Sequence, residues 1–166
     1  SGFKIYKIIS RIFNRSEKYI HHIINEVEKR GLPTELVLLP VIESAYNPHA
    51  TSRAKAAGLW QFIPSTGKLY NLKQTWWTDE RRDIKKSTKA ALDYLEKLNK
   101  IMGGDWYLAL AAYNWGENSV KRAIRKNKRL NKKTSYLYLR MPRETRNYVP
   151  KLLAVKEILL NPEKYG

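Results

Sequence analysis

The sequence predicts an all-α fold, α+β at most through a short hairpin, in a single domain. Apolar residues recur at helical spacing along most of the chain. Glycine or proline stands at the ends of these periodic segments, where helices begin or stop. The chain has 166 residues, 43% of them hydrophobic, which is enough for one buried core, and no repeat or low-complexity linker divides it.

The first helical segments end at recognisable signals. Residues 16–31 carry one apolar face, with Ser16 as the expected N-cap and Gly31 as the stop. A second segment starts at a Thr34 cap and runs to about Asn47-Pro48. Pro40 within it predicts a kink, or a break between two short helices.

The middle of the chain combines a loop with two helices. Residues 50–63 have no clean periodicity and are expected to form a loop, with a short hairpin at most. Pro64 then opens a short helix that ends near Tyr70. A longer helix follows over residues 83–102, and Gly103-Gly104 closes it.

The second half contains the segment that we expect to be the buried central helix. Residues 105–116 are apolar nearly all round, with Asp105 as the N-cap and Gly116 as the stop. A basic helix follows over about 117–127, and Pro142 is expected to open the last helix.

The net charge of +17 indicates an anionic partner. Nucleic acid, an anionic lipid surface and an acidic polymer such as a cell wall all fit this charge, and the dense stretch 121–133 also fits a solvated face. The sequence has no recognisable RNA-binding signature, so we expect no nucleic acid. No run of 18 apolar residues predicts a transmembrane segment.

Metal and cofactor chemistry is not expected. The chain has no cysteine, which excludes disulfides and thiolate zinc sites. The adjacent His21 and His22 point in different directions on a helix and make a poor pair of metal ligands.

One carboxylate, Glu43, stands at the end of the apolar run LVLLPVI. The negative end of the helix dipole and the apolar neighbours both disfavour ionisation, so we expect the pKa of Glu43 to be raised. A carboxyl that stays protonated near neutral pH is suited to general acid catalysis of glycosidic cleavage. Position alone favours a helix-end glutamate that is simply exposed to water, so position does not decide the role of Glu43.

The surrounding motifs carry a family resemblance. The stretches ESAYNPHATS and AAGLWQFIPSTG are followed in order by AAYNWGENSV at 111–120 and ETRNYVPKLLA at 144–154. Together they resemble the lytic murein transglycosylases of the soluble-lytic-transglycosylase family, which are related to goose-type lysozyme. The resemblance runs from about Gly31 to Leu160 and implies a lysozyme-like single domain with a buried central helix and a substrate cleft.

The resemblance implies a role for each matching residue. Glu43 corresponds to the catalytic acid and base, and Ser44 helps to hold the carboxyl or the helix end. Gly58 and Leu59 shape the turn that brings Gln61 to the sugar. The implied substrate-binding residues are Ser44, Ser52, Gln61, Phe62, Ile63, Tyr113, Asn114, Glu144 and Tyr148, with Glu144 orienting its surroundings and no metal. The tyrosines are equally compatible with core aromatics, and Trp60, Trp76, Trp77 and Trp115 could be core or could stack on sugars.

The implied reaction uses a single carboxyl. Most glycosidases need a carboxylate pair, and no second acid lies within the Glu43 motifs. In the family, the 2-acetamido group of N-acetylmuramic acid assists cleavage of its β-1,4 bond to N-acetylglucosamine, and the C6 hydroxyl closes a 1,6-anhydro ring. A hydrolytic lysozyme and a non-catalytic wall-binding protein are the alternatives.

The resemblance also implies where the protein works. We expect peptidoglycan strands and the anionic envelope as partners, and a monomer. The expected location is the bacterial periplasm or cell envelope, with outer-membrane anchoring through a segment outside these residues. Residues 1–30 would be a helical extension of the same domain, and residues 31–166 the catalytic domain.

Overall fold

The computed structural model describes residues 2–165, and the side chains of residues 4–165. Among them, the elements are helices, with no named strand. Three isolated antiparallel bridges, Thr51–Ala57, Ala57–Phe62 and Gln74–Asp79, are the β-pairing of this part of the chain. Two of them lie in the loop at 50–63, where the sequence predicted at most a short hairpin.

The chain divides into two compact units. The first contains residues 1–92 and 154–166, and the second contains residues 93–153. The division falls within two long helices, α5 (Ile84–Ile101) and α8 (Arg143–Leu160). Each unit is described separately below.

The first unit begins with helices α1 (Gly2–Arg15) and α2 (Glu17–Lys29). Ser16 stands at the N-cap position of α2 but makes no side-chain cap there. Its buried hydroxyl instead lies 3.5 Å from the carbonyl oxygen of Tyr46. The predicted capping role of Ser16 is therefore wrong, because a buried hydroxyl needs a partner and finds one in a distant turn.

The next helical segment is divided into two short helices close to Pro40, as the sequence predicted. A 3₁₀ helix, η1 (Thr34–Leu38), is followed by α3 (Leu39–Ser44), with Pro40 in the first turn of α3, where its missing N–H costs nothing. The expected cap at Thr34 is absent, since Pro33 holds the N-cap position. The helix also ends at Ser44, before the predicted Asn47.

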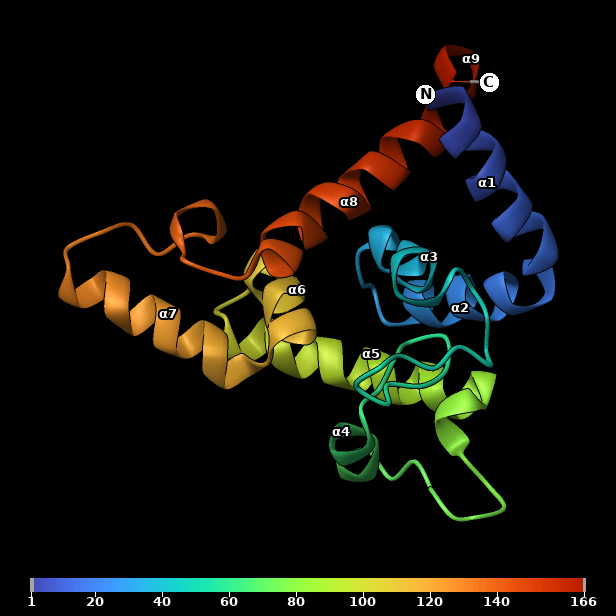
Figure 1. Ribbon diagram of the computed structural model, residues 1–166, viewed down its shortest axis with the longest axis horizontal. Helices are drawn as coiled ribbons and strands as arrows, with labels where there is room; N and C mark the ends of the chain where they lie inside the picture. Colours follow the sequence, from blue (N-terminus) through green and yellow to red (C-terminus); the bar gives the residue numbers. More distant parts are fainter. Residues whose placement is uncertain (1, 166) are drawn as a thin grey trace. The chain divides into compact units, whose positions relative to one another are not determined.

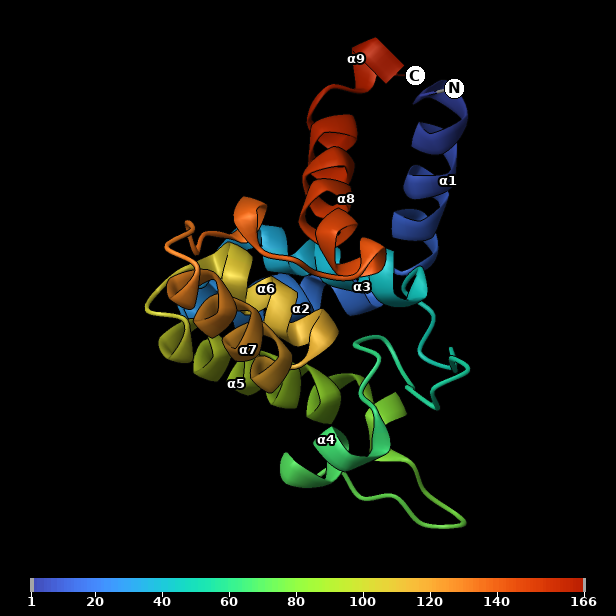
Figure 2. The ribbon, with the colours of Figure 1, turned by 60° about the vertical axis from the view of Figure 1, so that its left-hand side comes forward.

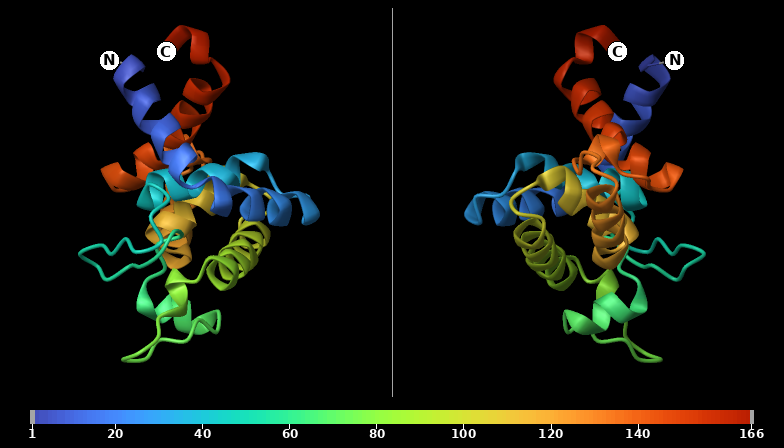
Figure 3. Two further views of the ribbon diagram at one scale, coloured as in Figure 1. Left: turned by 90° about the vertical axis from the view of Figure 1, so that its right-hand side faces the viewer. Right: turned by 90° about the vertical axis from the view of Figure 1, so that its left-hand side faces the viewer.

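An apolar cluster holds α3 against the chain ends. Ile9 of α1 and two residues of α8, Val155 and Ile158, form its buried centre. Val41 and Ile42 of α3 pack against this centre. Helix α9 (Pro162–Tyr165) lies beside α1, as the views in Figures 1, 2 and 3 agree. The two residues that precede Glu43 are thus fixed by this core.

The rest of the first unit contains α4 (Pro64–Leu69) and η2 (Glu80–Arg82), followed by the start of α5. Pro64 opens α4 as predicted. At the start of α5, the Asp83 carboxylate accepts a hydrogen bond from the backbone N–H of Lys86 at 2.8 Å. Asp79 caps η2 in the same way, by accepting from the N–H of Arg81.

The second unit contains α6 (Trp106–Trp115), α7 (Glu117–Arg129) and η3 (Tyr136–Tyr138). The expected burial of α6 is confirmed, since its central residues 108–112 are all buried. The Asp105 carboxylate accepts from the N–H of Leu108 at 3.0 Å, and Gly116, at φ +99°, separates α6 from α7. Helix α7 continues two residues beyond the predicted end.

No helix within residues 2–165 combines the length and the apolar character needed to cross a lipid bilayer.

Candidate active site

Glu43 is the penultimate residue of α3 and is half-buried. The helix ends directly after it, because Ala45 and Tyr46 both adopt left-handed backbone conformations, at φ +51° and +56°. Tyr46 can hold this uncommon conformation because its ring is buried and its hydroxyl donates to the Val37 carbonyl. The carboxyl therefore lies at a sharp helix end, whereas the sequence predicted that the helix continues to about Asn47. The expected rise in its pKa stays a prediction.

Ser44 joins this helix end to the glycine-containing loop. Its buried hydroxyl lies 2.8 Å from the carbonyl oxygen of Leu59 and 3.1 Å from that of Pro40. A serine at the end of a short helix thus connects the segment of Glu43 to the segment of Gln61. This contact matches the expectation that Ser44 holds the helix end.

Gly58 allows a close backbone approach in that loop. Its φ is +85°, and a Cβ placed there would lie 1.9 Å from the carbonyl oxygen of Arg81. Only glycine fits both conditions. Gln61, three residues later, also has a positive φ of +53°, and its side-chain amide donates to the carbonyls of Ala50 and Gly58 at 3.2 and 2.8 Å.

The other predicted residues of this loop divide between surface and core. The Ser52 hydroxyl accepts from the N–H of Ala56 at 3.1 Å. Phe62 is buried, while 44% of Ile63 is exposed. Trp60 is fully buried, and its indole N–H donates to Thr88 at 3.1 Å, so its place is in the core and not on a sugar.

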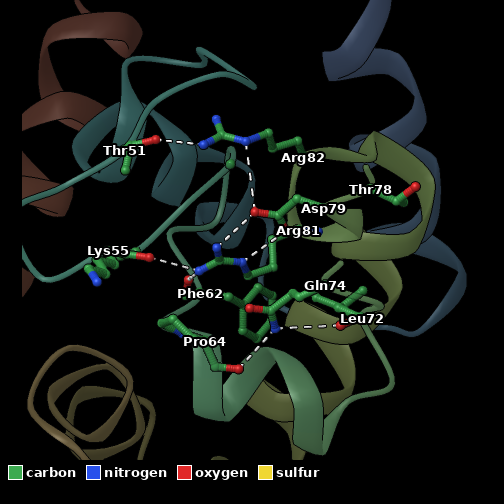
Figure 4. Close-up of polar contacts among 12 residues, drawn as sticks. Thr51, Lys55, Phe62, Pro64, Leu72, Gln74, Thr78, Asp79, Arg81 and Arg82 are labelled. Carbon is green, nitrogen blue, oxygen red and sulfur yellow. Dashed lines mark hydrogen bonds and ion pairs between the residues drawn. The ribbon is translucent and has the colours of Figure 1, made fainter. Parts of the chain in front are cut away.

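Arg81 anchors the loop, and the sequence gave no expectation for it. Its buried guanidinium donates to the carbonyls of Lys55 and Phe62 at 2.8 and 2.9 Å, and it pairs with the Asp79 carboxylate at 2.8 Å (Figure 4). One side chain thereby holds together two segments of irregular backbone. A cation within an irregular polar segment has no periodic signature, so only the fold identifies it.

The next carboxylates after Glu43 in the sequence, Asp79 and Glu80, both form ion pairs. Partial burial works to raise the pKa of Asp79, but the hydrogen bonds and charge of Arg81 outweigh it, so the pKa is lowered. Glu80 bonds to Lys86 at 2.7 Å and to the Lys73 backbone, and these contacts lower its pKa. Both groups are held ionised, which suits structural ion pairs and not proton donation.

The second unit brings two other predicted residues together. The Asn114 amide donates to the Glu144 carboxylate at 3.2 Å and accepts from the Thr145 hydroxyl at 2.9 Å. The end of α6 is thereby joined to the start of α8. The Tyr113 ring packs against that of Tyr94, with centroids 5.6 Å apart, and the Tyr148 side chain is buried.

The predicted site residues thus form two sets. Glu43, Ser44, Ser52, Gln61, Phe62 and Ile63 belong to the first unit, and Tyr113, Asn114, Glu144 and Tyr148 belong to the second. Over the residues that the structure describes, no group of three or more His, Asp or Glu side chains is arranged to hold a metal ion.

Comparison with known proteins identifies the family of this chain. The family described as the Transglycosylase SLT domain matches residues 22–136. The chain belongs to the SLT transglycosylase family. The match includes Glu43, the Gly58–Gln61 turn and α6.

Two curated relatives of this SLT domain are named membrane-bound lytic murein transglycosylases. It is 54% identical over 152 residues to membrane-bound lytic murein transglycosylase D of Escherichia coli, a match that covers 92% of this chain and 34% of that protein. Membrane-bound lytic murein transglycosylase C of Cronobacter sakazakii is 32% identical over 127 residues, covering 69% of this chain and 35% of that protein. The chain thus spans about a third of the length of these curated relatives.

Solved structures confirm the fold class. The 70 kDa soluble lytic transglycosylase of Escherichia coli superposes with a TM-score of 0.60 at 24% identity, over 76% of this chain and 21% of that protein. An inactive variant of lytic transglycosylase Slt from Pseudomonas aeruginosa gives 0.58 at 23% identity, over 86% and 23%. The SLT domain therefore has the all-α, lysozyme-like fold that the sequence predicted.

Proposed function

We propose that this SLT domain is a peptidoglycan lytic transglycosylase. It cleaves the β-1,4 bond between N-acetylmuramic acid and N-acetylglucosamine and leaves a 1,6-anhydromuramoyl end. The observation that carries the proposal is Glu43, half-buried at the fixed end of α3 and connected through Ser44 to the Gln61 loop. The relatives named lytic murein transglycosylases support the choice of substrate.

The proposed chemistry needs one carboxyl in two protonation states. Glu43 first donates a proton to the glycosidic oxygen, while the substrate's own acetamido oxygen stabilises the anomeric carbon. The ionised Glu43 then accepts the proton of the C6 hydroxyl as that oxygen attacks C1. Atoms and charges balance without water, and the engaged state of Asp79 and Glu80 leaves neither as a second catalytic acid.

The remaining predicted residues would bind and orient the sugar. We propose Ser52, Gln61, Phe62 and Ile63 as the substrate-binding residues of the first unit, and Tyr113, Asn114, Glu144 and Tyr148 as those of the second. Gln61 uses its amide N–H groups within the loop, so its carbonyl oxygen is the atom suited to accept from the acetamido N–H. Glu144 would act through Asn114, which it contacts.

The charge of the chain fits this substrate. Peptidoglycan carries free carboxylates, and a net charge of +17 would raise the encounter rate and the retention of the enzyme on an anionic wall. We propose the periplasmic face of the cell envelope as its place of action, with an outer-membrane anchor outside these residues, in line with the membrane-bound relatives.

Replacing Glu43 by glutamine tests the proposal. The amide keeps the shape of the side chain but cannot deliver a proton, so cleavage of purified peptidoglycan should fall by about 10²- to 10⁴-fold or more, with unchanged circular dichroism and wall binding. Glu28→Gln, which removes one exposed carboxylate from α2, is the matched control and should retain turnover. Wild-type turnover by Glu43→Gln would contradict the assignment. Wall binding without turnover by the wild type would favour a non-catalytic wall-binding protein.

A further inference from the structure

Two adjacent tryptophans, Trp76 and Trp77, are almost completely exposed. Their exposed fractions are 90% and 89%, whereas Trp60 is fully buried. Tryptophan is highly buried on average in folded proteins, and clustered exposed apolar side chains mark sites of interaction. The proposed catalytic chemistry uses neither residue.

The turn that displays them is built from internal hydrogen bonds. The Thr75 backbone N–H donates to the Thr78 carbonyl at 2.7 Å, and the Thr75 hydroxyl accepts from the N–H groups of Trp77 and Thr78 at 3.2 and 3.0 Å. Three backbone donors at the tip are therefore satisfied without water. This matters for entry into an apolar phase, where an unsatisfied backbone donor costs several kcal/mol.

The base of the turn is fixed to the rest of the first unit. Gln74 pairs with Asp79 through an isolated bridge, and its amide donates to the carbonyl of Pro64 at 2.9 Å. Figure 4 shows this contact beside the Arg81–Asp79 pair. Figures 1 and 2 show the chain leaving α4 and extending into this turn, whose tip points away from the helix. A fixed turn presents both rings with little conformational entropy to lose on binding.

Lysines precede the tip of the turn, and the acids that follow the tip are paired with cations. Residues 62–78 contain Lys68 and Lys73 and no acidic residue. The next acids, Asp79 and Glu80, are engaged by Arg81 and Lys86. Exposed apolar side chains accompany these lysines, since 78% of Leu69 in α4 is exposed. Tryptophan with lysine is the combination found where proteins enter the interface of an anionic bilayer.

We propose that the 74–79 turn and α4 form a membrane-contact surface, on which Trp76 and Trp77 enter the headgroup region of a bilayer while Lys68 and Lys73 bind anionic lipid headgroups. A glycan is less suited to this turn. A sugar site surrounds its ligand on several sides, and walls beside the two tryptophans would cover part of them, but both residues are about nine-tenths exposed to solvent. This surface acts independently of cleavage at Glu43.

Vesicle co-sedimentation tests the proposal, with vesicles of phosphatidylcholine alone and of phosphatidylcholine with 30% phosphatidylglycerol. Trp76→Ser with Trp77→Ser should weaken binding to the anionic vesicles by about 10- to 100-fold. Lys68→Ser with Lys73→Ser should weaken it by about fivefold for each lysine at low salt, with little change on neutral vesicles. Leu137→Ser, which removes an apolar side chain that is 85% exposed in the second unit, is the matched control and should bind as the wild type does.

Quenching by brominated lipids adds a direct readout of insertion. Fluorescence of the wild type should be quenched on anionic vesicles, and that of the double tryptophan variant should not. The proposal is overturned if the wild type does not bind the vesicles or if the double tryptophan variant binds them equally well. It is also overturned if that variant loses binding to lipid-free peptidoglycan alone, which would assign the rings to glycan stacking.

Discussion

Replacing Gly58 by alanine should destabilise the protein far more than the same change at other glycines with positive φ. Two effects add at Gly58. An L-residue in the left-handed region costs about 1–2 kcal/mol. The new Cβ would also lie 1.9 Å from the Arg81 carbonyl oxygen, a backbone atom whose neighbouring side chain is fixed by three partners. We expect a total loss of about 3 kcal/mol or more.

Gly31 and Gly103 are matched controls for this prediction. Their φ values are +64° and +69°, and a Cβ at either position would meet nothing within 4 Å. Alanine there should cost only about 1 kcal/mol, from backbone strain alone. For a chain of this size, 1 kcal/mol lowers Tm by about 2–4 °C, so Gly58→Ala should lose about 6–12 °C and the controls about 2–4 °C.

Thermal unfolding followed by circular dichroism measures all three variants under one condition. The difference between Gly58→Ala and the controls isolates the close approach to Arg81 from the backbone strain that all three share. Equal losses in the three variants would refute the reasoning, because they would show that the Cβ at Gly58 meets no obstacle.

Three further predictions test electrostatics and the Ser44 contact. Replacing four cations of the basic stretch 121–133 by serine should weaken binding to purified peptidoglycan in a sedimentation assay at low salt. The defect should shrink above about 0.3 M salt, because the screening length is then only a few ångströms. A defect that does not depend on salt would indicate local misfolding. The changed residues are Lys126, Lys128, Arg129 and Lys132. The pKa of Asp79 is lowered in the folded state, so its ionised carboxylate stabilises the fold. The difference in unfolding free energy between the wild type and Asp79→Asn should be fully present above about pH 4, the usual pKa of Asp, and should disappear as the pH falls through the lowered pKa. Urea unfolding across pH measures this difference, and a difference that does not change with pH would contradict the prediction. Ser44→Ala should cost about 1–2 kcal/mol in urea unfolding, because the buried Leu59 carbonyl loses its donor, and a neutral result would remove Ser44 from the loop contact.

Local chemistry let the sequence predict most of the helices. Asp105 and Gly116 bound α6 where capping and glycine preferences place them, and the apolar composition of that helix predicted its burial. Pro40 similarly predicted the break that places Glu43 on a short helix of its own. These signals act over a few residues, so they can be read without the fold.

Contacts between segments far apart in the chain could not be predicted from the sequence. Ser16 looked like an N-cap, but its hydroxyl lies near Tyr46, 30 residues away. The close approach of Gly58 to Arg81 and the anchoring of the loop by that arginine depend on long-range packing with no periodic signal. Exposure was equally hard to predict, since Trp60 is buried and Trp77 is exposed although both stand in segments without clear periodicity.

The composition of the cleavage products tests the central claim most directly. Both a lytic transglycosylase and a lysozyme would begin with protonation by Glu43, so loss of wall turbidity does not distinguish them. With Asp79 and Glu80 engaged in ion pairs, the internal C6 hydroxyl is the favoured acceptor, since an oriented intramolecular group can act at an effective molarity of roughly 10⁵ M or more. Mass analysis of peptidoglycan digested by the purified protein should therefore find 1,6-anhydromuramic ends, lighter than hydrolytic products by one water and inert to borohydride. Mainly reducible muramic ends would contradict the account and identify a hydrolytic lysozyme.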